Sequence, residues 1–249
     1  MATTYSSRVI TVFSSRVHLG ALSLIVSGIL FILYPVLRPF SDESTLQGAE
    51  AFASTAWVLS HMLAVVAFIL LALGLLGLHS IFQKTTVERL ASLALILIWI
   101  GVGFTLPYYG AEIFALHAIG QEAVKQQSAV LLPLVDAVRF SGPAVVMFAA
   151  GLLLLAVGPI LVAIAAWRSG MLSRWSVLSF ALGFALYIPQ FFGSQPIRVA
   201  HGLLVAFGCI WVALSMVRDK NPRSKLLHRH ATKSGEQAMD KKLTISQSD

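Results

Sequence analysis

The feature that most constrains this chain is a series of apolar runs, each 18 or more residues long and each free of Asp, Glu, Lys and Arg. About 20 such residues in a helix cross the roughly 30 Å hydrocarbon core of a bilayer. An open strand leaves backbone groups without hydrogen bonds in lipid, so each run is expected to be helical. The pattern predicts an all-α, polytopic membrane bundle.

Six runs are present, and we expect each to form one transmembrane helix. They cover residues 17–37, 57–80, 91–109, 144–167, 175–193 and 199–217. Composition agrees with this interpretation, because only 12% of residues are charged, against roughly a quarter in soluble domains. The predicted organisation is a cytoplasmic segment at 1–16, a transmembrane domain at 17–217 and a basic cytoplasmic tail at 218–249.

The arrangement of Lys and Arg predicts the orientation. With the N-terminus inside, 14 basic residues face the cytoplasm and 4 face outward, namely Arg38, Lys125, Arg139 and Arg198. Cytoplasmic loops of membrane proteins carry such an excess of basic residues. We therefore expect both termini in the cytoplasm and a multi-pass protein of the plasma (inner) membrane. The net charge of +7 is explained by this asymmetry rather than by nucleic-acid binding.

Two segments are predicted to lie outside the spans. The tail at 218–249 is polar and rich in Lys, Arg and Ser, so we expect it to be disordered and to lie against anionic lipid. Its His228-Arg229-His230 is a weak candidate for metal binding. The outer segment at 110–140 alternates charged and apolar residues, as an amphipathic or re-entrant element does.

Polar side chains able to do chemistry gather toward the predicted outer ends of the helices, whereas the bilayer centre has no Asp, Glu, Lys or Arg. Because polar groups within spans are costly, they are candidates for function. The candidate catalytic residues are Glu112, His61, His201 and Asp136. The candidate substrate-binding residues are Tyr109, Arg139, Arg198, Tyr108, His117 and Gln190.

Helical spacing predicts which of these residues share a face, since positions three or four apart are neighbours. The predicted pairs are Tyr108 or Tyr109 with Glu112, Trp57 with His61, Asp136 with Arg139, and Arg198 with His201. If the faces converge, they line a cavity open to the outer leaflet beneath an amphipathic cover at 112–138. Alternatively, each side chain lies separately among the headgroups and is solvated by water.

The cluster fits acid–base chemistry on a lipid-like or small amphiphilic substrate, with Glu112 or Asp136 moving the proton and Arg139 or Arg198 binding an anionic headgroup. A metal-dependent hydrolase is an alternative, although no His-Glu-x-x-His motif is present. Haem ligation by His61 and His201 outside and His18 and His79 inside is another. No cofactor is specified by the sequence.

A transporter or permease is the main alternative of another class, but transporters commonly place polar coupling residues near the midplane, where this chain has none. A non-catalytic membrane subunit also fits. Partners are expected to be membrane lipids and not nucleic acid, because no nucleotide-binding or nucleic-acid motif is present.

The segment Trp57-Val58-Leu59-Ser60-His61-Met62, the Leu/Gly-rich run up to His79 and the later Tyr109-Gly110-Ala111-Glu112 resemble a loose group of uncharacterised bacterial multi-helix inner-membrane proteins. This group carries no assigned reaction. The resemblance implies a bacterial plasma-membrane location and directs attention to His61 and Glu112.

Overall fold

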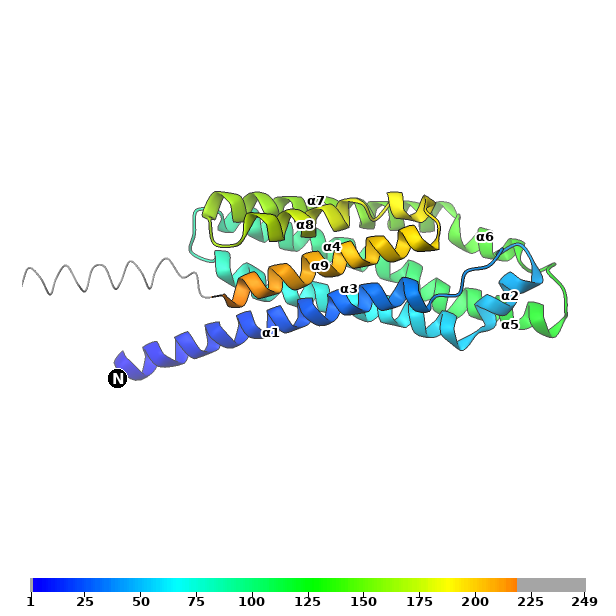
Figure 1. Cartoon of the computed structure of the whole chain (residues 1–249), viewed down its shortest axis with the longest axis horizontal. Coiled ribbons are helices and arrows are strands. Elements are labelled where there is room, and N and C mark those ends of the chain that lie inside the picture. The colour runs from blue at the N-terminus through cyan, green and yellow to red at the C-terminus, as the bar shows by residue number, and fades with distance from the viewer. Residues whose placement is uncertain (1, 219–249) are drawn as a thin grey trace, which may run out of the picture. The chain divides into compact units, whose positions relative to one another are not determined.

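The computed structural model describes residues 2–218, with side chains from residue 15 onward. The chain divides into a unit at 1–217 and a second at 218–249. The predicted basic tail, including His228-Arg229-His230, lies outside the described residues apart from Arg218. Within the described part, every regular element is a helix (Figure 1).

Six principal helices alternate in direction (Figure 1). They are α1 (Ala2–Leu37), α3 (Thr55–Phe82), α4 (Glu88–Ala111), α7 (Gly142–Ser169), α8 (Arg174–Ala185) and α9 (Gln195–Val217). The shorter elements are α2 (Leu46–Ala53), the π-helix η1 (Glu112–Leu116), α5 (His117–Lys125), α6 (Pro133–Arg139) and the 3₁₀-helix η2 (Pro189–Phe192). We call the end of the bundle that carries α2, α5, α6 and η2 the cap end, and the opposite end the base end.

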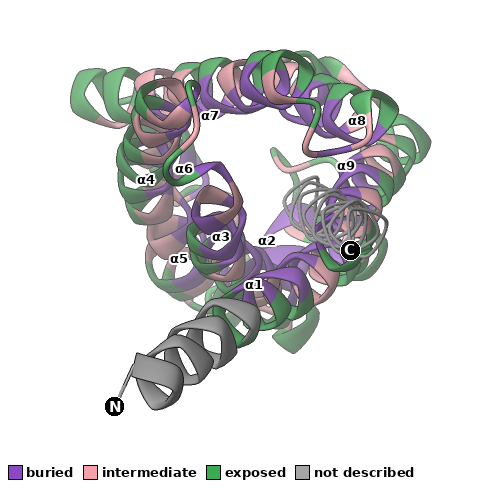
Figure 2. Ribbon diagram, turned by 90° about the vertical axis from the view of Figure 1, so that its left-hand side faces the viewer, coloured by how far each residue is buried: buried purple, intermediate pink, exposed green. Residues whose placement is uncertain are grey.

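The six principal helices form a closed ring. Each packs against its neighbours in the order α1, α3, α4, α7, α8, α9 and back to α1. Viewed along the bundle, buried residues face the interior of the ring and exposed residues face outward (Figure 2). The outward residues are largely apolar, including Leu59, Ile96 and Leu153. An apolar outer surface of this extent is suited to contact with lipid.

Five helical segments of the described chain are long and apolar enough to cross a membrane: Ser15–Leu37, Thr55–Phe82, Glu88–Lys125, Gly142–Ser169 and Gln195–Val217. The chain is therefore a multi-pass membrane protein. The predicted span at 175–193 differs from the others, because α8 has only 12 residues. A helix of that length extends about 18 Å, less than the hydrocarbon core.

The segment at 110–140, predicted to be amphipathic, is largely helical and extends the bundle. Helix α4 continues without a break through η1 into α5, which packs against α2. A second hydrophobic core lies here, separate from that of the ring, and its buried members are Ala49, Phe52, Trp57, Leu116, Ala123, Leu132 and Val135. Pro133 begins α6, and Pro143 lies in the first turn of α7, where a missing N–H costs nothing.

Small residues permit close contact between α1 and α3. A Cβ atom added at Gly77 would lie 2.7 Å from both the Gly20 Cα and the Arg16 carbonyl oxygen. Both are backbone atoms, so no side-chain rotation can relieve the overlap. Close packing of this kind is a main source of helix association where lipid surrounds the protein.

We expect Gly77→Leu to destabilise the bundle by about 1–3 kcal/mol, because α1 and α3 must separate. Gly103→Leu is the matched control, since a Cβ atom there meets nothing within 4 Å. Thermal unfolding in detergent measures both variants. Equal unfolding temperatures for the two would contradict this account of the α1–α3 contact.

Candidate functional site

Buried charges are concentrated at the cap end, where four elements meet. Arg38 follows α1, Glu43 precedes α2, Glu112 begins η1 and Arg139 ends α6. Arg38 and Glu112 are buried, and the side chain of Arg139 is only 12% exposed. Charges removed from water require partners.

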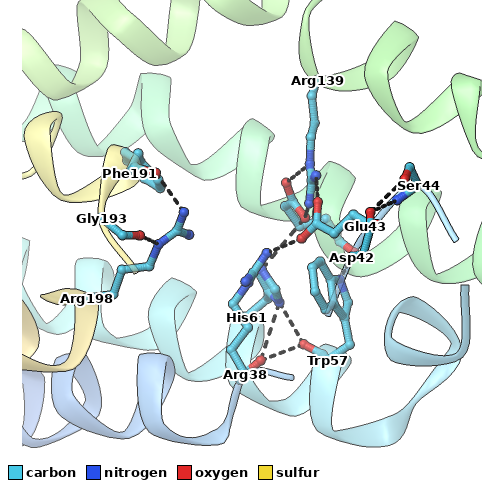
Figure 3. Close-up of polar contacts among 12 residues, drawn as sticks. Arg38, Asp42, Glu43, Ser44, Trp57, His61, Arg139, Phe191, Gly193 and Arg198 are labelled. Carbon is cyan, nitrogen blue, oxygen red and sulfur yellow. Dashed lines mark hydrogen bonds and ion pairs between the residues drawn. The ribbon is translucent and has the colours of Figure 1, made fainter. Parts of the chain in front are cut away.

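These four residues form one chain of ion pairs (Figure 3). Arg139 donates from Nε to Glu112 Oε1 at 2.7 Å and from Nη2 to Glu112 Oε2 at 2.8 Å. Its Nη1 donates to Glu43 Oε2, and Arg38 Nη2 donates to Glu43 Oε1 at 2.7 Å. Every oxygen of the two carboxylates is therefore bound by a guanidinium.

The pairing has the electrostatic effect expected of such contacts. Although burial opposes its charge, Glu43 has a lowered pKa because Arg139 and Arg38 stabilise the carboxylate. Burial likewise opposes the charge of Arg139, yet the hydrogen bonds and charges of Glu112 and Glu43 raise its pKa. The ion-pair chain thus keeps both groups ionised.

His61 lies beside this chain, with its Nε2 3.8 Å from Glu112 Oε2. Its Nδ1 is 2.7 Å from the Trp57 carbonyl oxygen, which can only accept, so Nδ1 carries a proton. The Trp57 indole in turn donates to the Glu112 carbonyl oxygen at 2.9 Å. These contacts join the start of α3 to the start of η1. A short π-helix such as η1, with i→i+5 hydrogen bonds, is often found at functional sites.

A layer of aromatic rings occupies the interior of the ring beside His61. The Tyr34 ring centroid lies 5.2 Å from that of His61 and 5.7 Å from that of Tyr109. The Tyr109 and Tyr187 hydroxyls are 3.2 Å apart. Tyr109 and Tyr187 are both almost fully buried, so this layer fills the bundle axis at the depth of the site.

Two cavities lie at this level. The α4–α7 cavity, of about 90 Å³, includes Tyr108, Glu112 and Arg139 among mainly apolar neighbours such as Phe104 and Met147. The α1–α9 cavity is smaller, about 20 Å³, which is room for a group the size of a water molecule. Its polar lining residues are Tyr34, Arg38, Tyr187, Gln190, Arg198 and His201.

Two arginines meet at the α1–α9 cavity. Arg198 donates from Nε to the Gly193 carbonyl oxygen at 3.1 Å and from Nη2 to the Phe191 carbonyl oxygen at 2.7 Å (Figure 3). Within the described part of the chain, Arg38 Nε is a buried donor without a hydrogen-bond partner. The carbons at the centres of the two guanidiniums lie 4.7 and 5.5 Å from the centroid of the same Phe40 ring.

The predicted site residues do not line a single cavity. Tyr108, Glu112 and Arg139 line the α4–α7 cavity, whereas Gln190, Arg198 and His201 line the α1–α9 cavity. His61 and Tyr109 are buried beside the aromatic layer. Trp57 and His61 interact as their spacing predicts, and Arg198 and His201 share a cavity.

Two predicted site residues lie apart from both cavities. Asp136 is exposed and does not pair with Arg139, which turns instead toward Glu112 and Glu43. The Nδ1 of His117 lies 2.8 Å from the Phe52 carbonyl oxygen, which ties α5 to α2. Asp136 and His117 both belong to the short helices of the cap end and not to the ring of principal helices.

The contacts of the histidines bear on the metal and haem alternatives. His201 Nε2 lies 2.8 Å from the Gly183 carbonyl oxygen, and His79 Nε2 lies 2.9 Å from the Ser92 hydroxyl. Among the residues that the structure describes, no three His, Cys, Asp or Glu side chains are close enough to hold a metal ion. His61 and Glu112 are neighbours, but no third such side chain of the described residues joins them.

Sequence reasoning missed Glu43 and gave Arg38 only a role in topology. Glu43 lies in the polar connection after α1, which helical spacing does not describe. The sequence did contain one signal. Arg38 directly follows an apolar run, a position from which an arginine side chain would extend into water unless it had a partner in the protein. The contact between Glu43 and Arg139, 96 residues apart, has no local signature.

We expect Arg139→Leu to lower the free energy of unfolding by about 3–5 kcal/mol, because Glu112 is left buried without its guanidinium. The double variant with Glu112→Leu should recover much of that loss, since the uncompensated charge is gone. Lys125→Leu, at an exposed position, is the control. Thermal unfolding in detergent measures all three, and a double variant no more stable than Arg139→Leu would contradict the ion-pair account.

No protein-family model, curated protein or solved structure significantly matches this chain.

Proposed function

We propose that the protein resides in the plasma membrane with its cap end outside and both termini in the cytoplasm. The charges of the described residues support this orientation. The base end of the bundle carries Arg16, Lys84, Arg89, Arg168 and Arg174 with one acid, Glu88. At the cap end, acidic residues are at least as numerous as basic ones. The acidic residues include Asp42, Glu43 and Glu122. Basic residues favour the cytoplasmic side.

We also propose that the sixth crossing consists of α8 together with the turn and η2 that follow it. The chain from Arg174 to Phe192 runs from the base end to the cap end. The turn and η2 place Tyr187 and Gln190 inside the protein, where both are buried. Irregular backbone at membrane depth is tolerated where protein covers it.

Four single-cysteine variants in a Cys209→Ala background test this topology. A membrane-impermeant maleimide applied to intact cells should label Lys125→Cys and Ser194→Cys at the cap end. Gln83→Cys and Arg174→Cys at the base end should be labelled only after the cells are opened. Labelling of Arg174→Cys together with Ser194→Cys in intact cells would rule out the sixth crossing.

For activity, we propose that the α1–α9 cavity binds the headgroup of a lipid-like or small amphiphilic molecule. The observation that carries this proposal is its lining, in which Arg198, His201 and Gln190 adjoin aromatic side chains of Phe40 and Phe191. A few convergent polar groups among apolar ones are typical of ligand sites. The small volume admits headgroup atoms, while the apolar part of the ligand lies along the outer surface.

The contacts favour binding over the acid–base chemistry predicted for Glu112. Both Glu112 oxygens accept hydrogen bonds from Arg139, so proton transfer would first require that ion pair to open. The guanidinium of Arg139 is likewise occupied by Glu112 and Glu43. Of the two arginines predicted to bind an anion, Arg198 is therefore the one with donors near an open cavity. A transporter using this site would add substrate flux in proteoliposomes to binding.

Lipid retention tests the binding proposal. Native mass spectrometry of the purified protein should show a retained amphiphile, and Gln190→Trp should lose it because the indole fills the cavity. Leu186→Trp is the matched control, since Leu186 lies one turn earlier and is exposed on the outer surface. Equal retention by Gln190→Trp and the wild-type protein would sink the proposal.

A further inference from the structure

The α1–α9 cavity has a charge imbalance that specifies its ligand more closely, on the basis of the binding function proposed above. Two guanidiniums, those of Arg38 and Arg198, line it, and no Asp or Glu does among the described residues. The nearest carboxylate of the ion-pair chain is Glu43, but its oxygens are bound by Arg38 Nη2 and by Arg139. No protein carboxylate is left to bridge the two cavity arginines.

The unpartnered Arg38 Nε points to a missing acceptor. Arg38 is 8% exposed, and its Nε has no protein acceptor within hydrogen-bonding reach in the described chain. A buried donor left unpaired is destabilising, because it has lost its hydrogen bonds to water. The rest of the guanidinium is held firmly, by Glu43 and by stacking 4.4 Å from the Trp57 ring centroid.

Arg198 is held in a comparable way. Its Nε and Nη2 donate to the carbonyl oxygens of Gly193 and Phe191, so η2 fixes the direction of the side chain. These neutral acceptors leave its charge uncompensated. Both guanidiniums contact the Phe40 ring, and both side chains line the cavity.

We propose that Arg38 and Arg198 bind an oxyanion of the phosphate class at the α1–α9 cavity, as the headgroup of an anionic amphiphile. Planar guanidiniums suit phosphate and carboxylate oxygens. One oxygen fits the space of about 20 Å³ that Arg38 and Arg198 both line. A cationic headgroup would meet two like charges, and a neutral one would leave the charge of Arg198 uncompensated.

Titration of the purified protein in a neutral maltoside detergent tests this assignment. The probes are decyl phosphate, inorganic phosphate, decanol and decyltrimethylammonium, with binding followed by calorimetry. Decyl phosphate should bind and the cationic amphiphile should not. Arg198→Gln should weaken decyl phosphate binding about tenfold or more, the size of one charge-assisted hydrogen bond.

Arg38→Lys keeps the positive charge but removes the guanidinium, and with it both the Nε donor and the Nη2 donor to Glu43. It should also weaken decyl phosphate binding about tenfold, whereas Lys125→Gln, at an exposed position of the cap, should leave it unchanged. Ligand-free thermal unfolding confirms that each variant remains folded. Should Arg38→Lys fail to fold, Arg198→Gln decides the question alone.

The outcomes separate this inference from the binding proposal. Wild-type affinity for decyl phosphate in Arg198→Gln, or equal binding of decyltrimethylammonium, would overturn the oxyanion site even if Gln190→Trp loses its retained lipid. Inorganic phosphate that binds as tightly as decyl phosphate, with the same arginine dependence, would support the oxyanion site and contradict an amphiphilic ligand.

Discussion

The arrangement at the cap end depends on one requirement, that charges removed from water be neutralised by direct contact. Glu112 and Arg139 are buried in a protein whose surroundings are apolar, and a two-point guanidinium–carboxylate contact satisfies both. Glu43 and Arg38 extend the pairing to the connection that leaves α1. The ion-pair chain thereby fixes the loop before α2, the start of η1 and the end of α6 in one geometry.

That geometry separates structural charges from available ones. Arg139 and Glu112 form an ion pair with each other. The aromatic layer of Tyr34, Tyr109 and Tyr187 fills the interior beside them. Arg198 and Arg38 line the α1–α9 cavity without an Asp or Glu among the described residues there, and Arg38 Nε has no acceptor. The same set of polar residues therefore divides into a group that holds the cap together and a group suited to binding an anion.

Prediction succeeded where the physics is local. Trp57 and His61 are one helical turn apart, and they interact as that spacing requires. It failed for Arg139, whose expected partner Asp136 lies on the exposed side of α6. Helical spacing identifies possible neighbours on one element, but it does not weigh them against a buried carboxylate that another element supplies. The buried ion pair with distant residues is the more stabilising one, because an ion pair exposed to water contributes little free energy.

The sequence by itself determined that the chain is helical and apolar, that polar groups avoid the bilayer centre, and that they gather at one end of the helices, because hydropathy and charge vary along the chain itself. Only the tertiary structure decided the ring order of the helices, the shortness of α8 and the partition of the predicted site between two cavities. Those properties depend on contacts such as Glu43 with Arg139, between segments 96 residues apart. The periodicity of residues along the sequence does not indicate which helix faces pack together when they lie so far apart in the chain.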